Sequence, residues 1–475
     1  MEDEMEASMG NGKKKKPLVS IIVLAYNHLE YTKLCIESIY KYTSHIDFEL
    51  IAVNNGSSDG TKEYFESLPG AKVINFEKNV GQWNGFNAGV KASRGRYISI
   101  VGNDTILTTN WMDNLLKCIK SDKKIGMAAA GANVIDNHQM ISADYSNLEE
   151  MQQFAKEYNK SNPKKWEERI RIIPTVCIIR PEVFKKAGYF DPTFRFGEYG
   201  DDDFCFRVRR AGYKLIFAGD TFIHHFGSVT TDIEHKKFNS LAISRQLFMD
   251  KYGLDIIRDG FYNAMLVDAI EYRKKQAVKI LGINTFCGCT PLQIKNRFKT
   301  IDVEDVYIST FTEDPKYITD LKTISESVFC GSLDNIRQFY RQERFDYIVL
   351  EEGLERHQNI EFIFRDLKNL LNDRGQLIFI MENESYFRNI IKLINGGTLC
   401  SENDFFYPCY NKDKLIKLFE TLGYKNITPV GCQIMASEDD KKIIDSMIDL
   451  PGIKNKEISR CALSIAYFVF SLEVD

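Results

Sequence analysis

The chain has 475 residues, of which 44% are hydrophobic and 27% are charged, and its formal net charge is −4. A chain of this length exceeds the usual size of a single hydrophobic core, so we expect two domains. The charge balance gives no reason to expect nucleic acid as a partner, and no apolar run approaches the roughly 20 residues that span a bilayer.

The N-terminus and the cysteines indicate a cytoplasmic protein. Residues 1–17 contain four consecutive lysines but no apolar segment of a secretory signal, so we predict a disordered tail. The 11 cysteines are scattered, and the closest pair is Cys287 and Cys289. This distribution is typical of reduced thiols and not of a disulfide framework or a zinc site.

Strands and helices alternate along residues 18–105. A continuous apolar run at 18–25 predicts a buried strand, further strands are predicted at 48–53, 72–76 and 97–101, and helices are predicted at 30–42 and 62–68. This order predicts an α/β domain with a mostly parallel sheet. Polar residues follow three of the strands, at Tyr26-Asn27, Asn54 to Asp59, and Asn103-Asp104. Ligands of parallel sheets bind at the carboxyl ends of strands, so we expect these residues to share one edge.

The stretch from Phe196 to Ser228 concentrates charge. Asp201, Asp202 and Asp203 precede a predicted helix, and a β-rich run then leads to His224 and His225. A solvated acidic turn at a helix N-terminus is one interpretation. The other is a site that holds a divalent metal and a general base, and the second acidic strand end at Asn103-Asp104 favours it.

Four segments in a consistent order carry a family resemblance. They are VSIIVLAYN, VNNGSSDGT, NVGQWNGFNAGVKASRGRYISIVGNDT and RPEVFKKAGYFDPTFRFGEYGDDDFCFRVRRAGY. Together they resemble family 2 glycosyltransferases of the GT-A fold, over about Leu18 to Asp255. The resemblance implies an inverting transferase that uses a nucleotide sugar and a divalent metal, Mg²⁺ or Mn²⁺.

The resemblance also assigns roles to individual residues. Asp104 matches the last acid of the family's DxD-like strand end and is the expected metal ligand, joined by His225 or its neighbour His224. Asp201 matches the general base that deprotonates the acceptor hydroxyl, and Asp203 matches the second acidic position of that motif. Gly102 and Gly200 stand where acids are common in the family.

The same resemblance predicts the nucleotide site. Its expected residues are Tyr26, Asn27, Asn54, Asp59, Asn79, Gly81, Asn87 and Asn103. Asn54 stands where the family usually has an Asp that contacts the imide of uracil or thymine, and an amide can still make that kind of contact. Residues 136–171 border the acceptor in such transferases; a solvated surface insertion is the alternative.

In the C-terminal half, a strand predicted at 277–283 is followed by the segments FDYIVL, LERH and LKNLLNDRGQLIFIMEN. This order resembles class I S-adenosylmethionine-dependent methyltransferases over residues 277–432. The expected cofactor loop departs from the pattern, because Gly282 replaces an acid and Asn284 replaces a glycine. We also find no acid at the end of the strand predicted at 306–310, whereas Asp334 matches an adenine contact. We therefore expect a Rossmann-like domain without catalysis, which serves packing, dimerisation or acceptor docking, and we do not expect S-adenosylmethionine as a cofactor.

These observations predict a GT-A domain at 18–262 and a methyltransferase-like domain at 263–475. The favoured function is transfer of a sugar from a UDP- or dTDP-sugar to a hydroxyl of a glycan, lipid-linked or protein acceptor in cell-envelope polysaccharide or glycoprotein synthesis. A lipid-linked acceptor would bring the protein transiently to the inner face of the membrane, and the C-terminal domain could form oligomers. The alternatives are a bifunctional glycosyltransferase and methyltransferase, and a non-catalytic glycan- or nucleotide-binding scaffold, which Gly102 and Gly200 favour.

Overall fold

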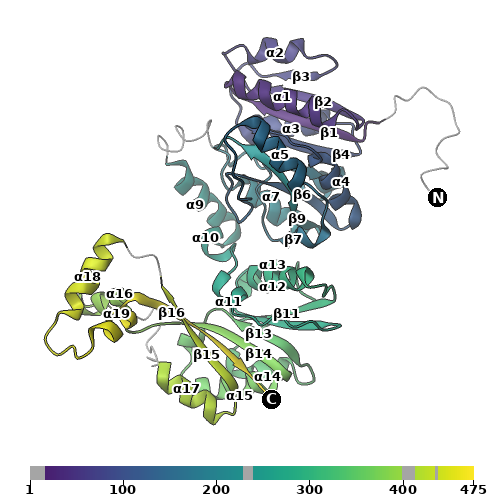
Figure 1. The fold of residues 1–475 in the computed structure, drawn as a ribbon. Helices are drawn as coiled ribbons and strands as arrows, with labels where there is room; N and C mark the ends of the chain where they lie inside the picture. The colour runs from purple at the N-terminus through teal and green to yellow at the C-terminus, as the bar shows by residue number, and fades with distance from the viewer. Residues whose placement is uncertain (1–15, 228–238, 398–411, 434–436) are drawn as a thin grey trace. The chain divides into compact units, whose positions relative to one another are not determined.

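The computed structural model describes residues 16–227, 239–397, 412–433 and 437–475. It contains two sheets, each with parallel and antiparallel strand pairs and with accompanying helices (Figure 1). Most of the predicted tail, and Ser228, lie outside the described residues. The chain divides into two compact units, one of residues 1–167 and 171–251 and one of residues 168–170 and 252–475. The predicted α/β class is confirmed for both halves of the chain.

The first sheet has the strand order β3-β2-β1-β4-β8-β6-β9-β5, and β7 pairs with β9. Up to residue 252 the elements are β1 (Val19–Ala25), α1 (Leu29–Thr43), β2 (Phe48–Asn54), α2 (Thr61–Ser67), β3 (Lys72–Asn75), α3 (Gln82–Ala92), β4 (Tyr97–Gly102), β5 (Thr105–Ile106), α4 (Trp111–Ser121), β6 (Ile125–Ala132), α5 (Leu148–Tyr158), β7 (Trp166–Arg169), β8 (Val176–Ile179), α6 (Pro181–Ala187), α7 (Gly200–Arg210), β9 (Lys214–His225) and α9 (Ser240–Tyr252).

Strand β1 sets the position of the site. All seven of its residues are buried, as expected for a central strand covered on both faces. It pairs in parallel with β2 and β4, with Ala25 opposite Asn54 and Leu24 opposite Gly102. The chain order reverses at β1, and such a switch point opens a crevice at the carboxyl ends of the strands. The polar residues that follow the three strands therefore meet at one edge, as the sequence predicted.

Long-range pairing brings the end of β9 to the same edge. The two-residue strand β5 follows Asp104 and pairs antiparallel with β9, so that Thr105 lies opposite His225. The backbone N–H of Phe226 donates to the carbonyl of Asp104 at 3.0 Å. Asp104 and His225, 121 positions apart in the chain, are thus fixed beside each other by backbone hydrogen bonds.

Helix α7 begins against the side chain of Trp83. The indole Nε1 of Trp83 donates to the carbonyl of Gly197 at 3.1 Å, and its ring stacks on Phe190 at 4.8 Å between centroids. A Cβ atom built on Gly200 would lie 2.1 Å from that Nε1, a distance that real Cβ contacts do not reach. Gly200 therefore leaves the space that Trp83 fills.

The second unit contains a seven-stranded sheet of order β12-β11-β10-β13-β14-β16-β15, with β16 antiparallel to both of its neighbours. Its elements are α10 (Ile256–Asp259), α11 (Ala264–Asp268), β10 (Val278–Ile283), α12 (Cys289–Thr300), β11 (Val306–Thr312), α13 (Ile318–Leu321), β12 (Ser327–Cys330), α14 (Ile336–Phe339), β13 (Phe345–Leu350), α15 (Ile360–Asn369), β14 (Leu371–Glu382), α16 (Phe387–Ile394), α17 (Lys412–Thr421), β15 (Lys425–Gln433), α18 (Glu438–Ile448), α19 (Lys456–Ser464) and β16 (Ile465–Glu473).

The packing of Trp83 against Gly200 should make the free energy of unfolding sensitive to substitution of Gly200. We expect Gly200→Ala to lower the free energy of unfolding by about 1–3 kcal/mol, because overpacking a filled space forces neighbours to move. Without that clash, Ala would stabilise a helix by about 1 kcal/mol relative to Gly. Trp83→Phe removes the indole N–H, so the same Gly200→Ala change should cost less in that background. Urea unfolding of the four proteins measures both effects, and a stabilised Gly200→Ala variant would contradict this packing.

Candidate functional site

A cavity of about 440 Å³ opens at the carboxyl edge of the first sheet. Its walls come from the strand ends, the start of α3, the segment before β8, the turn before α7 and the end of β9. Seven residues that the sequence predicted for the site line it, namely Tyr26, Asn79, Gly81, Asn103, Asp104, Asp201 and His225. The structure therefore gathers the predicted metal ligand, the predicted base and part of the predicted nucleotide site around one space.

Asparagine side chains shape the wall that follows β2. Asn55 donates from Nδ2 to Asn79 Oδ1 at 3.0 Å, and its own Oδ1 accepts from the backbone N–H of Val80 at 3.0 Å. Asn79 Oδ1 also accepts from the N–H of Gly81 at 2.8 Å. These bonds tie the loop after β2 to the glycine-containing segment before α3. Asn55 lines the cavity, but the sequence analysis had selected its neighbour Asn54.

Four of the predicted nucleotide-binding residues do not line the cavity. Asn54 is buried and uses its amide on Ser57 and Asn75, and Asp59 accepts from the N–H of Leu29 at the start of α1. Asn27 accepts from the N–H of Ser58, and Asn87 exchanges two hydrogen bonds with the backbone of Phe190. These side chains hold together the loops around the cavity.

Asp104 and His225 lie on the same wall, with Asp104 Oδ2 3.3 Å from His225 Nε2. The other ring nitrogen of His225, Nδ1, is 2.7 Å from the carbonyl of Val134, which can only accept a hydrogen bond. Nδ1 therefore carries a proton, and in the neutral ring the lone pair of Nε2 faces the carboxylate. Two acceptors at this distance need a proton or a cation between them.

The pKa of His225 reflects this arrangement. Burial alone would lower the pKa of His225, but the hydrogen bond and the negative charge of Asp104, with the Val134 carbonyl, raise it above 6.5. When a backbone carbonyl fixes the proton on Nδ1, Nε2 is the ring nitrogen that can bind a metal, which is the usual arrangement of a metal-binding histidine. One oxygen and one nitrogen donor fit Mn²⁺ or Mg²⁺ when water and substrate phosphates complete the coordination.

His224 points away from this pair. Its Nδ1 is 2.6 Å from the hydroxyl of Tyr145, and its ring packs edge-on against Phe226. Successive residues of a strand face opposite sides, so the two histidines cannot share one ligand direction. Among the residues that the structure describes, no group of three or more His, Cys, Asp or Glu side chains surrounds a metal position.

The three consecutive aspartates at the start of α7 have different surroundings. Asp203 is fully buried and pairs with Arg207 at 2.6 Å and with Lys251 at 2.6 Å. Asp202 is buried and forms a two-pronged ion pair with Arg171, with Nε–Oδ1 at 2.5 Å and Nη2–Oδ2 at 3.0 Å. Asp201 lines the cavity. Asp203, the second residue predicted to be catalytic, is therefore directed into ion pairs away from the cavity.

Asp201 is a carboxyl group that gives up its proton near neutral pH. Burial and the adjacent charge of Asp202 raise the pKa of Asp201 to about 7, and Arg171 opposes part of this rise. A general base works best when its pKa lies close to the working pH, so this environment suits proton removal from a hydroxyl.

Other wall residues were not selected from the sequence. Glu198 and Arg195 come from the turn before α7, and Trp83 comes from α3. Asp136 lines the cavity from the insertion that the sequence analysis placed near the acceptor, and Thr175 lies just beyond it. Their positions follow from the tertiary packing of α3 and of the loops around the cavity, which residue spacing does not report.

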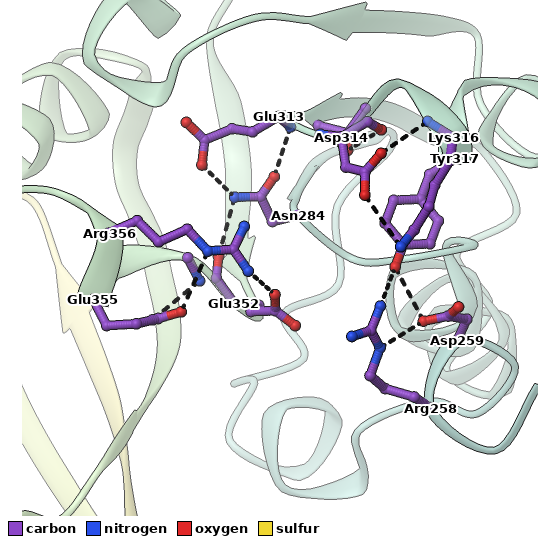
Figure 2. A network of polar contacts seen from close by, with 12 residues as sticks. Arg258, Asp259, Asn284, Glu313, Asp314, Lys316, Tyr317, Glu352, Glu355 and Arg356 are labelled. Atoms are coloured by element: carbon purple, nitrogen blue, oxygen red, sulfur yellow. Dashed lines mark hydrogen bonds and ion pairs between the residues drawn. The ribbon is translucent and has the colours of Figure 1, made fainter. Parts of the chain in front are cut away.

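In the second unit, Asn284 in the loop after β10 forms hydrogen bonds with residues that follow β11 and β13 (Figure 2). Asn284 donates from Nδ2 to Glu313 Oε2 and to the carbonyl of Glu352, both at 3.1 Å, and its Oδ1 accepts from the N–H of Glu313 at 2.9 Å. His357 contacts the same Glu313 oxygen at 3.3 Å and Asp334 at 3.2 Å. Strand β11 ends at Thr312, so Glu313 is the acid at its end. The sequence analysis ended that strand at Thr310 and missed it.

Within the described segments, no helix has the length and apolar character needed to cross a bilayer.

Comparisons with known proteins match a large part of the first unit. The family model "Glycosyl transferase family 2" matches residues 20–188. The chain is 27% identical over 212 residues to an uncharacterized glycosyltransferase, MJ1057, of Methanocaldococcus jannaschii, which covers 43% of this chain and 69% of that protein. It is 26% identical over 231 residues to the glycosyltransferase AglE of Haloferax volcanii, covering 47% and 71%.

Two solved structures are also similar. One is the mannosyltransferase PcManGT from Pyrobaculum calidifontis in complex with GDP-Man and Mn²⁺, with a TM-score of 0.36, 16% identity and coverage of 50% of this chain and 65% of that one. The other is an S-adenosylmethionine-dependent methyltransferase from Archaeoglobus fulgidus, with a TM-score of 0.32, 12% identity and coverage of 48% and 98%. Residues 20–188 of the first unit therefore match glycosyl transferase family 2, and a second α/β unit follows them.

Proposed function

We propose that the N-terminal domain is an inverting, metal-dependent glycosyltransferase that moves a sugar from a UDP- or dTDP-sugar to a hydroxyl acceptor. The acceptor belongs to cell-envelope polysaccharide or glycoprotein glycan synthesis. The observation that carries this proposal is the single cavity lined by Asp201, Asp104 and His225 beside the loops that follow β1 and β2.

The proposed mechanism follows from the wall residues. Ionised Asp201 removes the proton of the acceptor hydroxyl, and the oxygen attacks the anomeric carbon from the face opposite the diphosphate. The new C–O bond forms while the bond to the diphosphate oxygen breaks, so the configuration inverts and a nucleoside diphosphate leaves. Asp104 and His225 would hold a divalent cation, whose positive charge stabilises the leaving diphosphate. Tyr26, Asn55 and Asn79 orient the nucleotide.

The base assignment gives a first prediction. Asp201→Asn should reduce release of nucleoside diphosphate from the matching nucleotide sugar by about 10²–10⁴-fold, because no group then accepts the proton. In the parent protein, kcat/KM should fall about tenfold per pH unit below pH 7, since only ionised Asp201 acts. Unchanged turnover in Asp201→Asn would refute this role.

Stability should respond in the opposite direction. A carboxyl whose pKa is raised on folding leaves stability unchanged below its ordinary pKa of 3.8, lowers it progressively between 3.8 and about 7, and imposes the full cost above 7. Asp201→Asn should therefore melt at a higher temperature than the parent at pH 8, and the gain should shrink at pH 4. A variant that is less stable at pH 8 would show that the carboxylate has a structural role.

The metal assignment gives a prediction with a matched control. Titration with Mn²⁺ in the presence of a nucleoside diphosphate, followed by electron paramagnetic resonance, should show affinity more than about tenfold weaker in His225→Gln and in Asp104→Asn. His224→Gln should bind Mn²⁺ as the parent does, because His224 faces Tyr145. Equal losses in both histidine variants would contradict the assignment.

For the second domain we propose a non-catalytic role. Asn284 and His357 engage Glu313, the acid that would otherwise be available to a nucleoside ribose. Calorimetric titration of the whole chain with S-adenosylmethionine should give no saturable heat, while the nucleotide sugar binds in the same preparation. Saturable binding of S-adenosylmethionine would favour the bifunctional alternative instead.

A further inference from the structure

The start of α7 presents three adjacent carboxylates, of which a single one is needed as a base. Neighbouring carboxylates raise each other's pKa values and can share a proton, so three equivalent groups would make a poor base at neutral pH. The fold must therefore separate them.

Positively charged side chains from three different segments form ion pairs with two of the three carboxylates. Asp203 forms ion pairs with Arg207, one turn further along α7, and with Lys251 of α9. Arg171, from the segment before β8, takes Asp202 with both prongs of its guanidinium, and the side chains of this pair are 12% and 5% exposed. Asp201 has no ion pair with any Lys, Arg or His among the described residues, and it lines the cavity.

We propose that Arg171 is a positioning residue of the transferase site, which holds Asp202 in a buried ion pair and leaves Asp201 as the acid that faces the acceptor. Arg171 itself does not line the cavity. Its fork geometry matters, because a guanidinium occupies both carboxylate oxygens whereas an ammonium is a point charge. This inference rests on the proposed function and adds a residue to it.

The surroundings of Asp201 leave Arg171 as the adjustable charge. The groups around it are Asp202 and the thiol of Cys205 on its own helix, Arg171, and the other charged residues of the cavity wall, Asp104, Asp136, Arg195, Glu198 and His225. Burial keeps the Cys205 thiol neutral, because it raises its pKa well above 9. Of the charges beyond the cavity wall, Asp202 favours the protonated form of Asp201 and Arg171 favours the ionised form.

The test is the pH profile of kcat/KM for nucleotide-sugar hydrolysis, with water as the acceptor. In Arg171→Met, Asp202 loses its partner and competes for the proton, so the acid limb should move up by about one pH unit or more and recover at alkaline pH. At pH 7, where about half of Asp201 is ionised in the parent, a shift of one unit is a loss of about fivefold. Arg171→Lys keeps the positive charge, so its acid limb should lie between that of the parent and that of Arg171→Met. A loss that is uniform across pH, without a moved limb, would overturn the proposal and assign Arg171 a purely structural role.

A second pair of variants covers the case in which Arg171→Met does not fold. Asp202→Asn removes the like charge and leaves Arg171 to act on Asp201, so its acid limb should move to lower pH. Arg171→Met/Asp202→Asn removes both charges and should return the limb toward that of the parent. Coincident limbs in these two proteins would also overturn the proposal. Asp201→Asn distinguishes failure of the proposed base from failure of the proposed role of Arg171. If Asp201→Asn stays active, the proposed base is wrong. If it is inactive and the acid limb is unmoved in the Arg171 and Asp202 variants, only the role of Arg171 fails.

Discussion

The candidate site depends on how three adjacent carboxylates are kept apart. Asp202 and Asp203 are neutralised by arginine and lysine side chains from other elements, and Asp201 is left at the cavity wall. Buried charges are tolerated only when they are paired, so the ion pairs also fix the start of α7 in place. The same contacts join α7 to α9 and to the segment before β8. A helix whose first turn carries three acids is also favoured by its own dipole.

Two glycines that depart from the family pattern have a steric explanation. Gly200 faces Trp83, and a Cβ at Gly102 would lie 2.9 Å from Asp104 Oδ1. An acid at either position would displace a side chain that lines the cavity. The glycines that favoured a non-catalytic scaffold are thus compatible with an intact site, in which Trp83 and Asp104 fill the space.

Residue patterns predicted the architecture well and the details of the site in part. Apolar runs such as 18–25 fix a buried parallel strand, and polar residues after such runs reach the cavity edge by the geometry of the sheet. The family resemblance assigned the nucleotide contact to Asn54, whereas its neighbour Asn55 lines the cavity. Glu313 was missed as the acid at the end of β11 because this strand is two residues longer than the segment predicted from the sequence. Arg171 gave no local signal, since its partner Asp202 is 31 positions away.

We expect the first domain to bind a nucleotide sugar through this cavity with the help of a divalent metal. Thermal denaturation of the whole chain with UDP-, dTDP- and GDP-sugars, each with and without Mn²⁺, tests it directly, because a ligand that binds only the folded state raises the melting temperature. One nucleotide class should stabilise the protein, Mn²⁺ should enlarge the shift, and Asp104→Asn should remove the enlargement. No shift with any nucleotide sugar, with or without Mn²⁺, would contradict it.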